Sequence, residues 1–290
     1  MKMNTERGYR IGIGIFLALM VAVIGFPLVM TLSVSLQTMA EVNAPSPVML
    51  PRPPQWANYP AAMANGNWPL YLYNSAVITV VTVLVSLVIN SMAGFVFARI
   101  PFKGRSVVFV AILIGMMIPP QVTLIPVFAM LRHAPFAGGN DIMGNGGSGL
   151  LNTHLGLILP FVAGSFGVFL CRQFYLDFPK ELDDAALIDG CGRFGQFARI
   201  YLPLSGPVLA SLGILKFTGT WNEYTWPLVM TNGEALKTVQ IALTAYRDEA
   251  VIYWNLLMAA TLVAGLPIYL VFFFAQKHFV SGLLSGSVKG

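Results

Sequence analysis

Six stretches of the chain are strongly apolar and almost free of charge, and they limit the folds that are open to it. A transmembrane helix requires about 20 consecutive, mostly apolar residues, because the hydrocarbon core of a bilayer is about 30 Å thick. The sequence therefore predicts an all-α membrane protein with six transmembrane helices. They are expected at about 11–36, 71–98, 106–131, 150–171, 204–220 and 251–276.

The composition excludes an ordinary soluble fold. Only 10% of the 290 residues are charged and 56% are hydrophobic, whereas a soluble domain carries about 25% charged residues. No polar stretch reaches the roughly 50 residues of a small soluble domain, so residues 1–290 are expected to form a single transmembrane domain. The net charge of +5 is spread along the chain, so no nucleic-acid partner is expected. Cys171 and Cys191 match no disulfide or metal-ligand pattern, and no metal site is predicted.

The distribution of lysine and arginine predicts which side of the membrane each loop occupies. With a cytoplasmic N-terminus, twelve of the 17 basic residues fall on the cytoplasmic side and four on the other side, while Lys216 lies within a span. Cytoplasmic loops of membrane proteins generally carry the excess of basic residues. Both termini are therefore expected in the cytoplasm.

The third predicted span contains Pro119, Pro120 and Pro126. Each proline removes a helical hydrogen bond, and lipid tolerates this only where protein or a water-lined cavity satisfies the freed backbone groups. Two interpretations stay open. The span is either a kinked helix that packs in the bundle, or it lines a transport pathway at Pro119 and Pro120.

The segment 172–203, between the fourth and fifth predicted spans, holds five of the twelve acidic residues. Its acidic residues suit the positive N-terminal end of a first helix, and Gly190 is placed to end that helix. Arg193–Tyr201 is expected to form a second helix. Pro203 is expected to disfavour helix at Leu202 and to set a break before the fifth span. An ordered polar hairpin of this kind either docks a partner or packs against its own bundle.

The hairpin contains a set of residues at fixed spacing, namely Asp184, Ala185, Ala186, Gly190, Ile200, Leu202 and Pro203. In this order they resemble the cytoplasmic EAA loop of binding-protein-dependent ABC importer permeases. That pattern is Glu-Ala-Ala, three residues, Gly, nine residues and Ile-x-Leu-Pro. The one departure is Asp184, since the family usually has Glu there; the charge is kept and the reach is shorter.

Further segments resemble the carbohydrate-uptake branch of this family. They are 180–182, 188–190, 199–204, 221–223, 226–228, 152–153, 156–160 and the C-terminal 286–290. The resemblance covers most of the chain and is weakest in the loops at 37–70 and 132–149. It implies a type I ABC importer permease fold with a cytoplasmic coupling-helix hairpin. It also implies the second permease of a heterodimer, similar to the six-span partner in maltose-type and glycerol-phosphate-type systems.

The resemblance implies how such a chain works with its partners. The hairpin would dock in a groove of a cytoplasmic ATPase subunit, so that closure of the ATPase dimer on ATP rocks the spans from inward- to outward-facing. The implied partners are a second permease, two ATP-binding cassette subunits, an extracytoplasmic solute-binding protein and the lipid of a bacterial cytoplasmic (inner) membrane. ATP–Mg would bind the ATPase subunits, and no cofactor is expected in this chain. The implied docking residues are Glu181, Asp184, Ala185, Ala186, Asp189, Gly190, Ile200, Leu202 and Pro203.

Lys216 is the only charged residue inside a predicted span. An unpaired charge at such a position costs about 2.5–3.5 kcal/mol on insertion scales. Lys216 is therefore expected to snorkel toward the outer surface or to pair with a carboxylate such as Glu223. Alternatively, it contacts the solute, which would then be anionic or heavily hydroxylated, or an acidic group on the partner subunit.

Trp221, Asn222 and Glu223 lie at the outer end of the fifth predicted span. Aromatic residues at this depth usually anchor a helix at the membrane interface. The alternative is a role in gating or in contact with the binding protein.

Other functional classes fit the sequence less well. A membrane-embedded enzyme would need a cluster of reactive groups, and the predicted spans contain no Asp or Glu and only an isolated His154. The chain is therefore expected to have no catalytic residues. A stand-alone carrier or channel would ordinarily use intramembrane carboxylates for ion or proton coupling. Within the ABC permeases, a subunit for a sugar or a related polyol or sugar phosphate is expected, with amino acids or peptides as the alternative.

Overall fold

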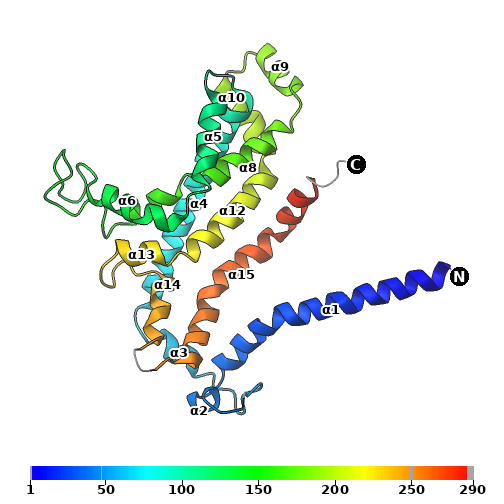
Figure 1. Ribbon diagram of the computed structural model, residues 1–290, viewed down its shortest axis with the longest axis vertical. Helices are drawn as coiled ribbons and strands as arrows, with labels where there is room; N and C mark the ends of the chain where they lie inside the picture. Colours follow the sequence, from blue (N-terminus) through cyan, green and yellow to red (C-terminus); the bar gives the residue numbers. More distant parts are fainter. Residues whose placement is uncertain (1, 47, 249–250, 286–290) are drawn as a thin grey trace. The chain divides into compact units, whose positions relative to one another are not determined.

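The computed structural model describes residues 2–46, 48–248 and 251–285, and the regular elements in these ranges are helices (Figure 1). The C-terminal segment 286–290, which contributed to the family resemblance, lies outside the described residues. The chain divides into two compact units. One comprises 1–68 and 242–266, and the other comprises 69–241 and 267–290.

The first unit contains the N-terminal helix and the segments that follow it. Its elements are α1 (Lys2–Ser35), α2 (Met39–Val42), α3 (Asn58–Met63), η3 (Leu243–Tyr246) and the beginning of α15 (Trp254–Ser285). The indole N–H of Trp68 donates to the Tyr246 hydroxyl at 3.0 Å, and that hydroxyl donates to the carbonyl of Ala62 at 2.6 Å. These buried bonds hold η3 against the end of α3.

The second unit contains the other helices and the polar hairpin. Its elements are α4 (Trp68–Arg99, from Pro69 on), α5 (Arg105–Gly115), α6 (Pro120–Arg132), α7 (His154–Ile158), η1 (Leu159–Phe161), α8 (Ser165–Leu176), α9 (Glu181–Ile188), α10 (Arg193–Gln196), η2 (Phe197–Tyr201), α11 (Leu202–Leu204), α12 (Gly206–Trp221), α13 (Thr225–Met230), most of α14 (Val239–Ala242) and the end of α15. In Figure 1, α9 and α10 lie at one end of this unit, away from α6 and α13.

Three of the predicted spans are unbroken helices. They are α1, α4 and α15, which are long and apolar enough to cross a membrane over 12–35, 68–99 and 254–275. The other three are present as bent pairs of helices, with bends of 103° between α5 and α6, 46° between η1 and α8, and 78° before α12. The described residues therefore provide three candidate spans, or six if each bent pair counts as one.

The bend in the third predicted span lies at its prolines. Pro119 is extended (φ −60°, ψ 135°), and Pro120 is the first residue of α6. Proline disfavours helix at the preceding residue and has no N–H for the preceding turn, so two adjacent prolines end α5 and start a new helix. With 11 residues, α5 is about 16 Å long at 1.5 Å per residue, which is too short to cross a bilayer alone.

The break before the fifth span is displaced from its predicted position. Leu202 is helical (φ −62°, ψ −45°), and the chain turns at Ser205 (φ −82°, ψ 4°). The prediction that Pro203 breaks the helix at Leu202 is therefore wrong. In a regular α-helix the proline ring would clash with the carbonyl four residues earlier, here Arg199. That residue lies in η2, a π-helical turn, and its wider backbone gives the ring room.

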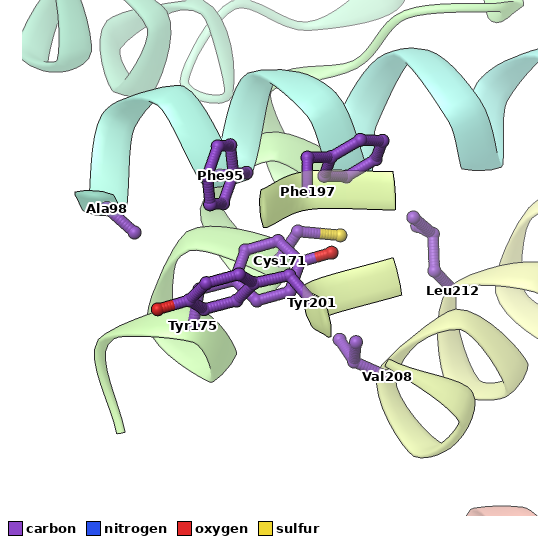
Figure 2. Close-up of a cluster of buried hydrophobic side chains, with 8 residues drawn as sticks. All are labelled: Phe95, Ala98, Cys171, Tyr175, Phe197, Tyr201, Val208 and Leu212. Atoms are coloured by element: carbon purple, nitrogen blue, oxygen red, sulfur yellow. The ribbon is translucent and has the colours of Figure 1, made fainter. Parts of the chain in front are cut away.

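A buried cluster joins the hairpin to α4, α8 and α12 (Figure 2). Its members are Phe95 and Ala98 from α4, Cys171 and Tyr175 from α8, Phe197 and Tyr201 from η2, and Val208 and Leu212 from α12. The second half of the hairpin therefore packs against its own bundle, as one of the two interpretations expected.

Candidate functional site

The first helix of the hairpin, α9, ends as its sequence predicts. Gly190 has a φ of +71°, a left-handed conformation that costs side chains with a Cβ free energy. Its N–H donates to the carbonyl of Leu187 at 3.0 Å, and the N–H of Cys191 donates to the carbonyl of Ala186 at 2.8 Å. These two bonds form a Schellman motif, which satisfies carbonyls left open at the helix end.

The predicted docking residues fall into two groups. Glu181, Asp184, Ala185, Asp189, Gly190 and Pro203 are exposed, whereas Ala186 is buried and Ile200 and Leu202 are partly buried. Ile200 and Leu202 pack against the cluster in Figure 2. The exposed face of α9 is therefore free for a partner, and the Ile-x-Leu-Pro part of the pattern is largely internal.

Sequence reasoning missed the exposed apolar residues at the tip of the hairpin. Ile188 is 87% exposed, and Leu187 and Phe194 are also exposed. Leu187 and Ile188 end α9, and Phe194 belongs to α10. The sequence could have indicated this exposed surface, because these large apolar residues lie in a segment that is otherwise polar.

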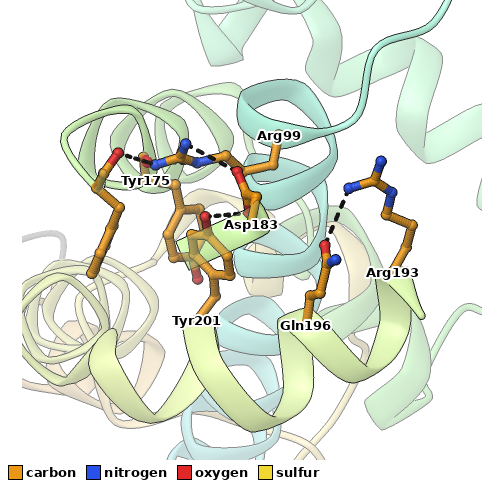
Figure 3. A network of polar contacts seen from close by, with 7 residues as sticks. Arg99, Tyr175, Asp183, Arg193, Gln196 and Tyr201 are labelled. Atoms are coloured by element: carbon orange, nitrogen blue, oxygen red, sulfur yellow. Dashed lines mark hydrogen bonds and ion pairs between the residues drawn. The ribbon is translucent and has the colours of Figure 1, made fainter. Parts of the chain in front are cut away.

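Sequence reasoning also missed the polar network that anchors α9 (Figure 3). Arg99 Nη1 lies 3.2 Å from Asp183 Oδ2, and the hydroxyl of Tyr201 donates to Asp183 Oδ1 at 2.7 Å. Arg99 also donates through Nε to the carbonyl of Tyr175 at 3.0 Å, and through Nη2 to the carbonyl of Phe178. The network fixes α9 to the end of α4 and to η2.

Burial strengthens the electrostatic attraction between Arg99 and Asp183. The side chains of Arg99 and Asp183 are 6% and 16% exposed, so their mutual attraction is weakly screened by solvent. Burial and, after it, the hydrogen bond to Asp183 raise the pKa of Tyr201, which therefore stays protonated as the donor. Asp183 is turned inward by these bonds, and the adjacent Asp184 is left on the exposed face.

A second group of polar contacts lies at the break in the fourth predicted span. Lys216 Nζ donates to the carbonyl of Phe161 at 3.1 Å, at the end of η1. The N–H of Gly164, at the start of α8, donates to Asn90 Oδ1 at 3.2 Å. One side chain of α12 and one of α4 thus each satisfy a backbone group at the break. Non-helical backbone in a membrane would need partners of this kind.

The predicted pairing of Lys216 with Glu223 is wrong. Glu223 Oε1 instead accepts a hydrogen bond from the N–H of Trp226 at 3.0 Å, at the start of α13. Nor does Lys216 extend freely to the outer surface, because its ammonium group is held by the carbonyl of Phe161. The last carbonyls of a helix carry a partial negative charge, so the end of η1 offers a partner to the Lys216 ammonium group. The sequence does not show this partner, because Phe161 lies 55 positions before Lys216.

Trp221 is not an exposed interfacial anchor within this chain. It is 3% exposed and stacks on Phe217 with a centroid distance of 5.7 Å and an interplanar angle of 8°. Asn222 is exposed, and its Oδ1 accepts a hydrogen bond from Gln240 Nε2 at 3.1 Å. Pro119 and Pro120 are also exposed, at the bend between α5 and α6.

A small cavity of about 10 Å³ lies beside Trp221 and Glu223. The hydroxyls of Thr79 and Thr238 are among its lining residues, and neither has a hydrogen-bond partner within the described structure. A cavity of this size and polarity fits about one water molecule. It is too small for a sugar ring.

Segments that resembled the family come together at α7 and α13, away from the hairpin (Figure 1). The indole N–H of Trp226 donates to the carbonyl of Gly156 at 3.0 Å. The N–H of Asn152 donates to the carbonyl of Met230 at 3.0 Å, and Asn152 Oδ1 accepts from the N–H of Asn232 at 2.6 Å. These contacts attach α13 to α7 and to the residues just before it. The family-like residues at 152, 156 and 226 therefore have a role in packing.

Comparison with known proteins gives matches over most of the chain. Residues 90–285 match the family described as binding-protein-dependent transport system inner membrane component. The arabinooligosaccharides transport system permease protein AraQ of Halalkalibacterium halodurans is 37% identical over 75% of this chain and 73% of its own length. The sn-glycerol-3-phosphate transport system permease protein UgpE of Agrobacterium fabrum is 32% identical over 93% and 94% of the two chains.

Solved structures give the same fold. A bacterial ABC transporter involved in the import of the acidic polysaccharide alginate has a chain that matches with a TM-score of 0.78 and 21% identity, over 95% of this chain and 98% of that one. A chain of a bacterial alginate ABC transporter in complex with an alginate pentasaccharide-bound periplasmic protein matches with a TM-score of 0.68 and 11% identity, over 94% of each chain. The type I ABC importer permease fold that the resemblance implied is confirmed.

Proposed function

Because this chain belongs to the family of binding-protein-dependent transport system inner membrane components and is an ABC importer permease, we propose that its solute is a sugar or a related polyol or sugar phosphate. The relatives that support this solute class are named for arabinooligosaccharides, lactose and sn-glycerol-3-phosphate. The alternatives, an amino-acid or peptide permease and a stand-alone carrier or channel, gain no support from these relatives.

The proposed topology has six crossings with both termini in the cytoplasm. It counts α5 with α6, and α7 with α8, as one span each and takes α12 as the fifth span. It rests on the excess of basic residues on the cytoplasmic side. The hairpin of α9 and α10 then lies in the cytoplasm, and α13 lies near the outer surface of the cytoplasmic (inner) membrane.

In the proposed assembly this chain forms half of the translocation pathway. The other half is a second permease subunit, and an extracytoplasmic solute-binding protein delivers the solute. ATP–Mg and the ATPase activity belong to two separate ATP-binding cassette subunits, so this chain needs no cofactor of its own. Pro119, Pro120, Lys216 and 221–223 are proposed to border the pathway or its gate.

The hairpin is proposed to couple this chain to an ATPase subunit. The observation that carries the proposal is that α9 presents Asp184 and Ala185 to solvent, while Asp183 ties the same helix to Arg99. A helix fixed in this way transmits a displacement to α4 instead of bending away. Asp184 offers a charge to a basic residue of the ATPase, and Ala185 allows close approach.

The substitution Ala185→Trp tests the docking step. Because Ala185 is exposed, the larger side chain should leave the fold and the membrane level of the permease unchanged. We expect recovery of the ATPase with the affinity-purified permease to fall roughly tenfold, which corresponds to about 1.4 kcal/mol, and solute uptake to fall with it.

Ala61→Trp is the matched control, because Ala61 is an exposed alanine of α3, a helix that the proposed topology places outside. It should leave ATPase recovery unchanged. Full ATPase recovery and uptake in Ala185→Trp would contradict the docking proposal.

A further inference from the structure

An apolar groove of about 180 Å³ lies between the end of α4 and the second helix of the hairpin. It is lined by Met92, Phe95, Val96, Ile100, Arg193, Phe194 and Phe197. Of these seven residues only Arg193 carries a polar side chain. The groove is separate from the exposed face of α9 that is proposed to bind the ATPase.

The position of the groove places it at the boundary between membrane and water. Ile100 directly follows α4, whose last residue is Arg99. Met92 lies seven residues before Arg99, which is about 10 Å along a helix at 1.5 Å per residue. The groove therefore extends from the end of α4 about one third of the way into the hydrocarbon core, which is about 30 Å thick.

Arg193 is held at the edge of this groove. Its Nη1 donates to Gln196 Oε1 at 3.2 Å, and Gln196 is itself fully buried (Figure 3). Gln196 Nε2 donates in turn to the carbonyl of Cys191 at 3.4 Å. A guanidinium has five N–H donors, and no carboxylate of the described residues lies within ion-pair distance of Arg193. Most of its hydrogen-bonding capacity is therefore open to a ligand.

We propose that this groove binds one anionic phospholipid, with its phosphate on Arg193 and an acyl chain along Phe95, Val96 and Phe197. Such a lipid supplies both the negative charge and the apolar chain that the groove requires. A helix of a partner protein would cover the apolar wall but would bury the Arg193 charge, unless it also brought an acid to that point. The cytoplasmic leaflet is rich in anionic lipid, which attracts basic residues near its surface.

The inference rests on the proposed topology, in which the end of α4 faces the cytoplasm. It is tested with the complete importer, purified from membranes and analysed by native mass spectrometry for retained phosphatidylglycerol. We expect Arg193→Gln to reduce the retained phosphatidylglycerol about fivefold, as the loss of one surface cation implies. Arg193→Lys keeps the charge and should retain most of the lipid.

Arg199→Gln is the matched control, because Arg199 is an exposed arginine of η2 that does not line the groove. It should leave lipid retention unchanged. Met92→Trp fills the apolar part of the groove and should displace the lipid although Arg193 remains. Equal retention of phosphatidylglycerol by wild type, Arg193→Gln and Met92→Trp would overturn the proposal.

Two further measurements distinguish a failure of the proposed lipid site from a failure of the proposed ATPase docking. A photoreactive amino acid at Met92 should crosslink to phospholipid; crosslinking to the second permease instead would overturn the lipid site. Recovery of the ATPase should be unchanged in Arg193→Gln, since α9 is intact. If Ala185→Trp left ATPase docking unaffected, the docking proposal would fail while the lipid measurements still decided the groove.

Discussion

The guanidinium of Arg99, the last residue of α4, lies 3.2 Å from the carboxylate of Asp183, the third residue of α9. The two residues are 84 positions apart in the sequence. Their ion pair connects the first helix of the hairpin to α4, which also contributes Phe95 and Ala98 to the buried cluster. A displacement of α9 is therefore expected to reach α4 without passing through a flexible loop.

Asp183 and Asp184 provide a test of this connection, because they are adjacent acids with opposite environments. Removing one partner of a buried ion pair costs about 3–5 kcal/mol, so Asp183→Asn should lower the thermal unfolding temperature of the purified complex. Asp184→Asn, on the exposed face, should change the free energy of unfolding by no more than about 0.5 kcal/mol. Equal losses of stability in the two variants would show that the pair does not anchor the hairpin.

Substitutions at Gly190 and Gly192 can show whether a side chain at the turn is destabilising because of backbone strain or because of steric overlap. An added Cβ meets nothing within 4 Å at either position, but only Gly190 has a positive φ. Gly190→Val should therefore cost more than the roughly 1–2 kcal/mol of an ordinary left-handed residue, and should lower ATPase recovery and uptake. Gly190→Asn should be better tolerated, and Gly192→Ala should behave like wild type. Normal uptake in Gly190→Val would refute a fixed turn here.

Lys216 is expected to matter for transport more than for stability. Lys216→Met removes the hydrogen bond to Phe161, but it also removes a charge that costs about 2.5–3.5 kcal/mol inside a membrane. The level of the protein should therefore stay near wild type. Uptake should fall, because the break between η1 and α8 loses one of its two side-chain partners. Lys216→Arg keeps a donor and should keep more activity. Wild-type uptake in Lys216→Met would dismiss a role in transport.

Gly94 marks a close approach of two helices. A Cβ on Gly94 would lie 2.5 Å from Cys171 Cβ and 2.9 Å from the backbone nitrogen of Arg172. Small residues allow such contacts between membrane helices, and overpacking them costs about 1–3 kcal/mol. Gly94→Ala should therefore reduce the unfolding temperature. Gly219→Ala in α12, where a Cβ meets nothing within 4 Å, should be neutral or slightly stabilising, and a similar loss there would contradict this explanation.

The sequence by itself determined the positions of the apolar helices, the polar hairpin and its glycine turn. These features depend on local properties, namely hydropathy over about 20 residues and the backbone preferences of single residues. The helices at 11–36, 71–98 and 251–276 and the left-handed Gly190 follow from them directly.

Tertiary structure alone decided which of two adjacent acids faces inward, where the helix breaks before the fifth span and what Lys216 contacts. Asp183 meets Arg99 across 84 residues, and Lys216 meets Phe161 across 55. Such pairs form because packing brings distant helices together and leaves specific backbone groups without partners. No local pattern records which side chain will lie nearest to them.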